Sequence, residues 1–245
     1  MWSLSREHAH CPLPPLARPH GGHAFRGPPW ARSCLGDATR RPVTMGGGIL
    51  QRQASEDLVD ELVPFVEEAG NPYFDWFFGD PAHARSCLGA WMRRPSSEIW
   101  IGRVTLFTLE DRVIGGLIAI PGSEVKGCRT ADAVAALGSC GAGGKAEIID
   151  RIRAARGVFA PVQADAFYAS KAWLIPSLRG RGYGARFMRQ FLAAGESRGY
   201  RRFQLDVWAG NRSAIRLYEA LGFKAIADSI SDETSLRYMS MIREG

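Results

Sequence analysis

The segment at residues 174–185 has the sequence Leu174-Ile175-Pro176-Ser177-Leu178-Arg179-Gly180-Arg181-Gly182-Tyr183-Gly184-Ala185. It places three alternating glycines between an apolar run and a run with helical spacing. Glycine lets backbone N–H groups approach a ligand closely, and a helix N-terminus adds free N–H donors and a positive dipole end. Arg179 and Arg181 add positive charge. The segment therefore predicts a strand–turn–helix cradle for a pyrophosphate group.

Two other kinds of phosphate-binding turn have to be compared with this one. A Walker-type loop needs Lys followed by Ser or Thr after its last glycine, and this turn has neither. A dinucleotide-binding turn is a closer fit, because Gly180 to Ala185 matches G-x-G-x-x-A and Asp206 follows at a suitable distance. A NAD-binding oxidoreductase that uses Gly180 and Gly182 is therefore an alternative. Against it, only residues 186–245 remain, and the preceding strand follows predicted antiparallel hairpins.

A second segment, Asn211–Phe223, has the pattern N-x-x-A-x-x-L-Y-x-x-L-G-F. Asn211 suits a helix N-cap, and Gly222 suits a helix C-terminus. The apolar positions between them fall on one helical face. By itself the segment predicts an amphipathic helix in which Tyr218 is a core aromatic residue.

Together the two segments resemble the GNAT acetyltransferase superfamily. Arg179, Gly182 and Gly184 match its R/Q-x-x-G-x-G/A motif, and Asn211–Phe223 is similar to its second motif at the expected separation. The likeness covers roughly residues 166–223, with a weaker likeness in layout from Ile49 onward. It implies acetyl-CoA as co-substrate and no metal. The cofactor-binding residues that it implies are Leu174, Ile175, Arg179, Gly180, Arg181, Gly182, Tyr183, Gly184, Ala185 and Asn211.

The resemblance also implies a mechanism in which a primary amine attacks the thioester directly in a ternary complex. A backbone N–H near Leu174 would stabilise the oxyanion, and Tyr218 would be the general acid. Asp206 is a candidate general base, because strand alternation puts it on one face with Gln204 and Trp208. The alternative for Asp206 is a surface carboxylate paired with Arg201 or Arg202. A non-catalytic acyl-CoA-binding module is a further alternative, which the presence of both Asn211 and Tyr218 disfavours.

The periodicity along the chain predicts an α/β (α+β) fold with a single mixed, mostly antiparallel central sheet flanked by helices. Ser55 is expected to cap the first helix, and residues 110–112 are expected to form a hairpin turn. A helical insertion is expected near residues 121–163. The expected strands are 49–54, 99–109, 113–120, 166–175, 202–208, 223–227 and 236–242, and the expected helices are 55–69, 81–94, 130–137, 146–156, 182–198 and 211–221.

Composition sets the domain boundaries and excludes several classes of protein. Residues 1–48 are rich in Pro, Gly, Arg and His, and predict a disordered leader before an N-acetyltransferase domain at residues 49–245. The net charge of +6 suits an anionic ligand but is too mild to indicate nucleic-acid binding. No apolar run has the length of a membrane span. The five cysteines form no CxxC pair, which favours the reducing cytoplasm.

The acceptor, a small-molecule or peptide amine, is the least determined part of the prediction. The first expected helix is acidic and could attract a cationic amine, or it could simply present a solvated face. An aromatic cluster follows, which could shape an acceptor pocket, belong to the core or form a homodimer contact. The acidic residues are Glu56, Asp57, Asp60, Glu61, Glu67 and Glu68, and the aromatic ones are Tyr73, Phe74, Trp76, Phe77 and Phe78.

Overall fold

The computed structural model describes residues 43–45, 48–139, 144–231 and 234–245. Most of the expected leader therefore lies outside the described residues. Its last part differs from the expectation, because β1 (Val43–Met45) pairs antiparallel with β2 (Ile49–Gln53). The sheet thus begins upstream of Ile49, where the folded domain was expected to start.

One eight-stranded sheet organises the domain, with the strand order β1-β2-β3-β4-β5-β6-β8-β7. Among the described strand pairs only β5 and β6 run parallel, and their neighbours are antiparallel. This confirms the predicted mixed, mostly antiparallel sheet. The remaining strands are β3 (Val104–Leu109), β4 (Arg112–Pro121), β5 (Ala166–Leu174), β6 (Arg202–Trp208), β7 (Lys224–Ser231) and β8 (Leu236–Glu244).

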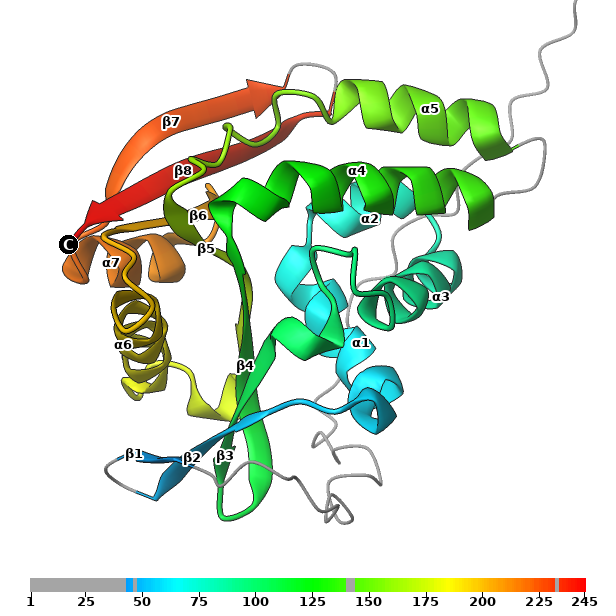
Figure 1. Cartoon of the computed structure of the whole chain (residues 1–245). Coiled ribbons are helices and arrows are strands. Elements are labelled where there is room, and N and C mark those ends of the chain that lie inside the picture. Colours follow the sequence, from blue (N-terminus) through cyan, green and yellow to red (C-terminus); the bar gives the residue numbers. More distant parts are fainter. Residues whose placement is uncertain (1–42, 46–47, 140–143, 232–233) are drawn as a thin grey trace, which may run out of the picture.

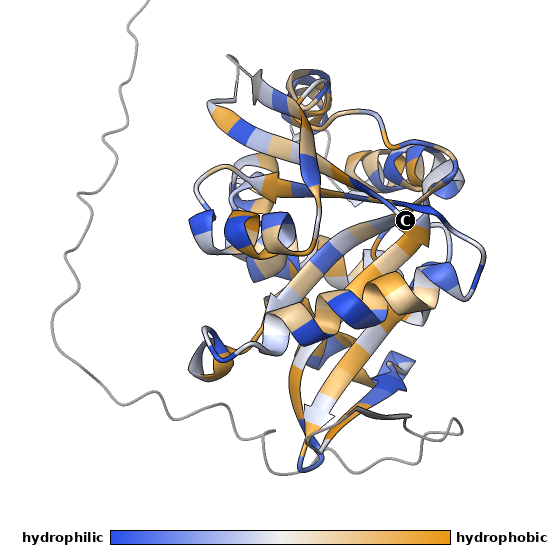
Figure 2. Ribbon diagram, turned by 90° about the vertical axis from the view of Figure 1, so that its left-hand side faces the viewer, coloured by the Kyte–Doolittle hydropathy of each residue, from blue (hydrophilic) through white to orange (hydrophobic). Residues whose placement is uncertain are grey.

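Helices cover both faces of this sheet (Figure 1). One core cluster joins apolar strand residues to the helices before β5, and a second cluster joins apolar strand residues to the helices after it. Figure 2 shows mostly hydrophobic central strands beneath helices with mixed surfaces. The first face carries α1 (Val59–Gly70), α2 (Tyr73–Phe78), α3 (Pro81–Met92), α4 (Gly122–Ser139) and α5 (Gly144–Ala154), and the second carries α6 (Tyr183–Glu196) and α7 (Arg212–Ala220).

Several element boundaries differ from the sequence prediction for local reasons. The side chain of Ser55 makes no capping hydrogen bond, and a 3-10 turn at Glu56–Leu58 precedes α1. Another 3-10 turn, Ile101–Arg103, delays the start of β3. The first insertion helix, α4, begins directly after β4 at Gly122. A Cβ at this position would lie 2.0 Å from the Gln163 carbonyl oxygen, so the close approach requires glycine.

The hairpin between β3 and β4 forms where the sequence predicts it. Leu109 pairs with Arg112, and the two residues between them, Glu110 and Asp111, have φ angles of 49° and 59°. A two-residue hairpin turn of the primed type needs positive φ at both central positions. The predicted turn is therefore correct, with Arg112 already in the returning strand.

The parallel pair β5–β6 is short, and this creates an opening in the sheet. Its register runs only from Ala166 opposite Arg202 to Ala169 opposite Leu205. At Ser170 the pairing of β5 with β4 shifts register, which marks a bulge in β5. Beyond it β5 continues along β4 while β6 continues along β8. The second halves of β5 and β6 therefore lack mutual pairing, and the opening between them positions the site.

Candidate active site

The glycine turn connects β5 to the N-terminus of α6, as the sequence predicts. Gly180 and Gly182 have φ angles of 74° and 81°, which favour glycine, and Gly182 stands directly before the helix. The first helical hydrogen bond runs from the Arg186 N–H to the Gly182 carbonyl. The N–H groups of residues 183–185 lie upstream of that bond and have no acceptor within the helix. The turn can therefore present several backbone donors to an anion.

The two arginines of the turn differ in their contacts. The Arg179 Nε atom donates to the Leu174 carbonyl oxygen at 3.1 Å, and its Nη2 atom pairs with Glu68 at 2.7 Å. Arg179 thus holds the turn to the end of β5 and to α1. Arg181 is exposed. Gly184 has a packing role, because a Cβ there would lie 3.2 Å from Leu217 on α7.

The end of β5 directs one backbone N–H group into the opening. The Ile175 N–H donates to the Ile114 carbonyl of β4 at 2.9 Å. Successive N–H groups along a strand point to opposite sides. The Leu174 N–H therefore points away from β4, toward β6 and the unpaired region between the two strands.

Asn211 and Tyr218 both belong to the α7 side of the sheet. Asn211 caps α7, since its Oδ1 atom accepts a hydrogen bond from the Ala214 N–H at 3.1 Å. Tyr218 packs against the core cluster beneath α6 and α7, with its ring centroid 6.0 Å from that of Phe223. Burial raises the pKa of Tyr218 to about 12. The phenol is therefore protonated at neutral pH and able to donate a proton.

Asp206 lies on the opposite face of β6 from the residues that pack under α6 and α7. Its Oδ2 atom accepts a hydrogen bond from the Tyr168 hydroxyl at 2.7 Å, and its Oδ1 atom accepts one from the Ser240 hydroxyl. Arg129 Nη2 is 3.7 Å from the same Oδ2 atom, and the side chain of Asp206 is only 3% exposed. The predicted face for Asp206 is correct. The core residues of the other face are Phe203, Leu205 and Val207.

The alternative interpretation of Asp206, an ion pair with Arg201 or Arg202, is wrong. Arg202 binds Asp165 at 2.7 Å and Glu244 at 2.9 Å. It lies on the same strand face as Asp206 but four residues away, which corresponds to about 13 Å along a strand. The basic partner of Asp206 is Arg129, which comes from the insertion.

Asp206 lines a cavity of about 630 Å³ on the face covered by α1–α5. The cavity is bounded by the junction of α1 with α2, by α4, by the chain that follows α5, and by β5, β6 and β8. Three of the five residues in the aromatic cluster line it, namely Tyr73, Phe74 and Phe77. Phe74, Phe77 and Phe78 also belong to the core. The cluster thus forms both a pocket wall and part of the core.

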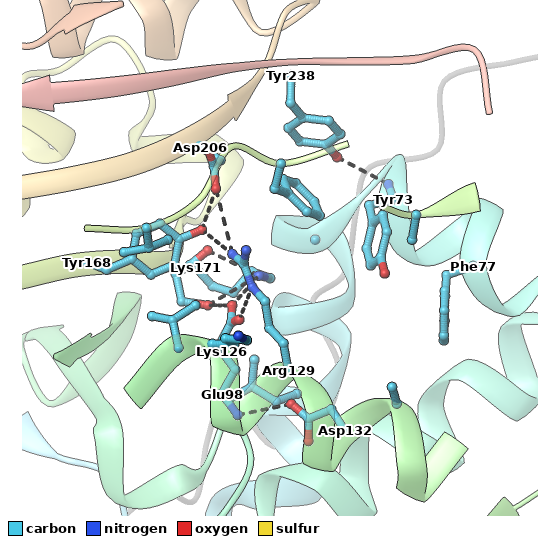
Figure 3. A pocket seen from close by; sticks show the side chains of 18 of the residues that line it. Tyr73, Phe77, Glu98, Lys126, Arg129, Asp132, Tyr168, Lys171, Asp206 and Tyr238 are labelled. Atoms are coloured by element: carbon cyan, nitrogen blue, oxygen red, sulfur yellow. Dashed lines mark hydrogen bonds and ion pairs between the residues drawn. The ribbon is translucent and has the colours of Figure 1, made fainter. Parts of the chain in front are cut away.

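A buried polar network crosses the cavity, as Figure 3 shows. Arg129 stands at its centre: Nε donates to Glu98 at 2.6 Å and Nη2 donates to the Tyr168 hydroxyl at 2.8 Å. Glu98 also accepts a hydrogen bond from Ser170, and Lys171 Nζ lies 3.6 Å from its carboxylate. The network links the insertion helix α4 to β5 and, through Tyr168, to β6.

Burial and neighbouring charges set the protonation states in this network. Burial opposes the ionisation of Glu98, but Arg129, Lys171 and the Ser170 hydroxyl outweigh it and lower its pKa to about 2. Burial lowers the pKa of Lys171, and Glu98 partly opposes this. Burial and the Asp206 charge raise the pKa of Tyr168 well above its ordinary value. Glu98 is therefore a carboxylate and Tyr168 a neutral phenol at neutral pH.

Of the two interpretations of the acidic first helix, attraction of a cationic amine gains no support, because its acidic face does not form a wall of this cavity. None of its six acidic side chains lines the cavity. Three of them pair with arginines outside it: Asp60 with Arg93, Glu67 with Arg85, and Glu68 with Arg179. The part of α1 that reaches the cavity is its C-terminal end, Ala69 and Gly70.

Most of the polar network leaves no signal in the sequence. Lys171 gave a signal, because it is a charged residue within a predicted apolar strand, and Tyr168 lies on the same strand. Glu98 and Arg129 gave none, since one follows a helix and the other lies in the insertion. Their pairing joins residues 31 positions apart.

No group of three or more His, Cys, Asp or Glu side chains in the described part of the chain is arranged to hold a metal ion. None of its helices is long and apolar enough to cross a membrane.

The fold thus has an opening in a mixed sheet, with the glycine turn at the end of β5 and a polar cavity on the face covered by α1–α5. Comparison with known families identifies the class. The model of the acetyltransferase (GNAT) family matches residues 63–223, well over half of the chain. The chain belongs to this family and is an N-acetyltransferase. The family uses acetyl-CoA as co-substrate.

Solved structures share the fold at low sequence identity. An N-acetyltransferase from Staphylococcus aureus Mu50 superposes with a TM-score of 0.58 at 16% identity, covering 78% of this chain and 98% of that one. Another acetyltransferase crystal structure gives a TM-score of 0.54 at 15% identity, covering 80% and 98%. A comparison with curated protein sequences found no match. These likenesses confirm the predicted fold class.

Proposed function

We propose that this N-acetyltransferase moves the acetyl group of acetyl-CoA to a primary amine by direct attack, with the two substrates bound on opposite faces of the sheet. One observation carries the proposal. The parallel pairing of β5 and β6 ends at Ala169 and Leu205, and Tyr218 and Asp206 lie on opposite sides of the opening beyond it. A cofactor on the α7 side and an amine in the cavity would meet there.

The cofactor would lie along the glycine turn and the opening. The N–H groups at the start of α6 and the exposed Arg181 suit its pyrophosphate. The pantetheine arm would follow the unpaired part of β5, with Asn211 as a polar neighbour. The Leu174 N–H, which points into the opening, would donate to the thioester oxygen as negative charge develops on it.

Acetyl transfer requires two proton transfers in addition to the formation of one bond and the breaking of another. The amine nitrogen forms the new C–N bond, and the C–S bond breaks with its electron pair on sulfur. Tyr218 would donate its phenolic proton to that sulfur, and its raised pKa keeps the phenol protonated until the sulfur departs. The proton lost by the amine would go to Asp206. Because both oxygens of Asp206 already accept hydrogen bonds, this transfer would pass through a water molecule or the Tyr168 hydroxyl.

The dinucleotide alternative lacks the architecture that it needs. A NAD-binding domain of that type has a mostly parallel sheet, whereas β5 and β6 are the only parallel pair among the described strands. A thermal-shift comparison of NAD with coenzyme A tests this point directly. We expect stabilisation by coenzyme A and none by NAD.

The decisive test is thiol release from acetyl-CoA with amine, amino-sugar and peptide acceptors, with the acetylated product identified by mass spectrometry. Acceptor-dependent release with a matching product supports the proposal. Tight binding of coenzyme A without release for any acceptor would instead identify a non-catalytic acyl-CoA-binding module.

A further inference from the structure

The charged side chains that line the cavity differ in whether they have a partner of opposite charge within the described part of the protein. Four basic side chains line it, Lys126, Arg129, Arg156 and Lys171, together with three acidic ones. Each acidic group already has partners within the protein. The balance of unsatisfied charge inside the cavity is therefore positive.

The three acidic groups are Glu98, Asp132 and Asp206. Glu98 accepts hydrogen bonds from Arg129 and Ser170 and lies beside Lys171. The carboxylate of Asp132 accepts hydrogen bonds from the Glu98 N–H and from Arg94, which does not line the cavity. Asp206 is held by Tyr168 and Ser240. None of these carboxylates is left to bind a second, cationic group of a ligand.

Two of the basic groups, in contrast, have no acidic partner within the described part of the chain. Neither Lys126 nor Arg156 forms an ion pair there, and both are exposed at the cavity. Lys126 and Arg129 are three residues apart on α4 and so project from the same side of the helix. Arg129 uses Nε and Nη2 in the network, and its side chain remains 31% exposed.

The rest of the lining suits an apolar body. Tyr73, Phe74 and Phe77 come from α2, and Phe159 stacks beneath the Arg129 guanidinium at 5.1 Å. A volume of about 630 Å³ lies within the usual range for a small-molecule site. Arg129 and Asp206 are 3.7 Å apart, so a cationic group and the candidate base are adjacent.

We propose that the acceptor is an amine that carries a carboxylate next to its amino group on an apolar body, as in an apolar α-amino acid. The carboxylate binds Lys126, Arg129 and Arg156, and the amine faces Asp206. This inference rests on the proposed acetyl transfer and adds the class of acceptor to it. It predicts discrimination against polyamines, whose second cation would meet these same basic groups.

Matched pairs of acceptors test the inference. Phenylalanine is compared with phenethylamine, tryptophan with tryptamine, and leucine with isopentylamine, by kcat/KM in the thiol-release assay. Losing a charge-assisted hydrogen bond costs enough to weaken binding by about ten- to hundredfold. We expect each amino acid to exceed its decarboxylated partner by at least that lower factor. Equal values, or a preference for the decarboxylated amines, would overturn the inference.

Substitutions in the cavity test whether its basic side chains cause the preference for amino acids over decarboxylated amines. In the double variant Lys126→Ala with Arg156→Ala, the ratio within each pair should fall by about tenfold or more. Lys126→Glu should move the preference toward the decarboxylated amine. Lys145→Ala is the matched control, because Lys145 is an exposed lysine of α5 that does not line the cavity. A ratio that changes equally in the control and the double variant would contradict the assignment.

A binding measurement separates failure of this inference from failure of the proposed function. Isothermal titration of the same pairs into protein saturated with coenzyme A needs no turnover. If no acceptor is acetylated, the proposed transfer fails, while tighter binding of the amino acids would still support the carboxylate site. If all acceptors are acetylated without preference and bind equally, only the carboxylate site fails.

Discussion

The Tyr168 hydroxyl donates a 2.7 Å hydrogen bond to Asp206 Oδ2, and so connects β5 to β6 at the point where their backbone pairing ends. Arg129 donates to the same hydroxyl at 2.8 Å. The insertion helix α4, the strand that leads to the glycine turn and the strand that carries the candidate base thus share one polar network. Changes in the insertion should therefore affect chemistry at the opening.

Tyr218→Phe should lower kcat by about 10²- to 10⁴-fold, because it removes the proton donor to the departing thiolate. The dissociation constant of acetyl-CoA should change little, since the ring and its packing remain. Stopped-flow thiol release and isothermal titration measure the two quantities. Tyr200→Phe is the control, because that phenol stacks on Phe167 beneath the sheet. An unchanged kcat would remove Tyr218 from the mechanism.

Asp206→Asn should lower kcat, because asparagine cannot take up the amine proton. The profile of kcat and kcat/KM between pH 5 and pH 9 measures this. Asp165→Asn serves as control, since Asp165 is an exposed carboxylate that pairs with Arg202. An identical profile for Asp206→Asn and the wild type would dismiss Asp206 as the base.

Gly182→Ala should weaken acetyl-CoA binding and lower the free energy of unfolding by about 1–2 kcal/mol, because alanine is strained at positive φ. Gly199→Ala is a close control. Gly199 has a φ of 87°, compared with 81° for Gly182, and a Cβ would meet no atom within 4 Å at either position. The two variants should lose similar stability in urea unfolding, and only Gly182→Ala should lose affinity for the cofactor. Equal affinities would argue against the turn as the pyrophosphate site.

Glu98→Gln should remove a pH-dependent part of the stability. The folded-state pKa of Glu98 lies at about 2, below its ordinary value of 4.5, so its contribution is present above pH 4.5 and lost as the pH falls toward 2. A shift of this size corresponds to stability on the order of 3 kcal/mol at neutral pH. Urea unfolding at pH 7 and pH 3 should show a large deficit of the variant at pH 7 that narrows at pH 3.

The control for Glu98→Gln is Asp60→Asn, which breaks an exposed ion pair with Arg93. Such a surface pair contributes less than about 1 kcal/mol. A deficit of Glu98→Gln that stays constant across the pH range would show that its carboxylate is not held in the charged form by Arg129 and Lys171.

Much of the fold could be predicted because its signals are local. The glycine turn, the Asn211 cap and the alternation along β6 each depend on neighbouring residues, and the structure has all three in the predicted places. The helix and strand boundaries that depend on contacts with residues distant in the sequence differ from the prediction. The start of α4 at Gly122 is one example, because it depends on the approach of Gln163.

The cavity could not be predicted in the same way. The sequence allows an aromatic pocket wall at residues 73–78, but it gives little sign of the polar side chains that face this wall. The acidic first helix allows either a cationic acceptor or a solvated face, and three of its acidic side chains pair with arginines outside the cavity. Which charges face a cavity depends on how helices dock, and helix docking leaves no pattern within a single segment.

The sequence by itself determined the part of this protein to which we assign the cofactor: the turn at residues 179–184, the helix with Tyr218 and the sheet that supports both. Short-range backbone preferences and strand alternation decide these features. The tertiary structure decided the cavity to which we assign the acceptor, where Glu98, Arg129 and Lys171 meet from the chain after α3, from α4 and from β5. Burial brings these charges together, because each can leave water only when the others compensate it.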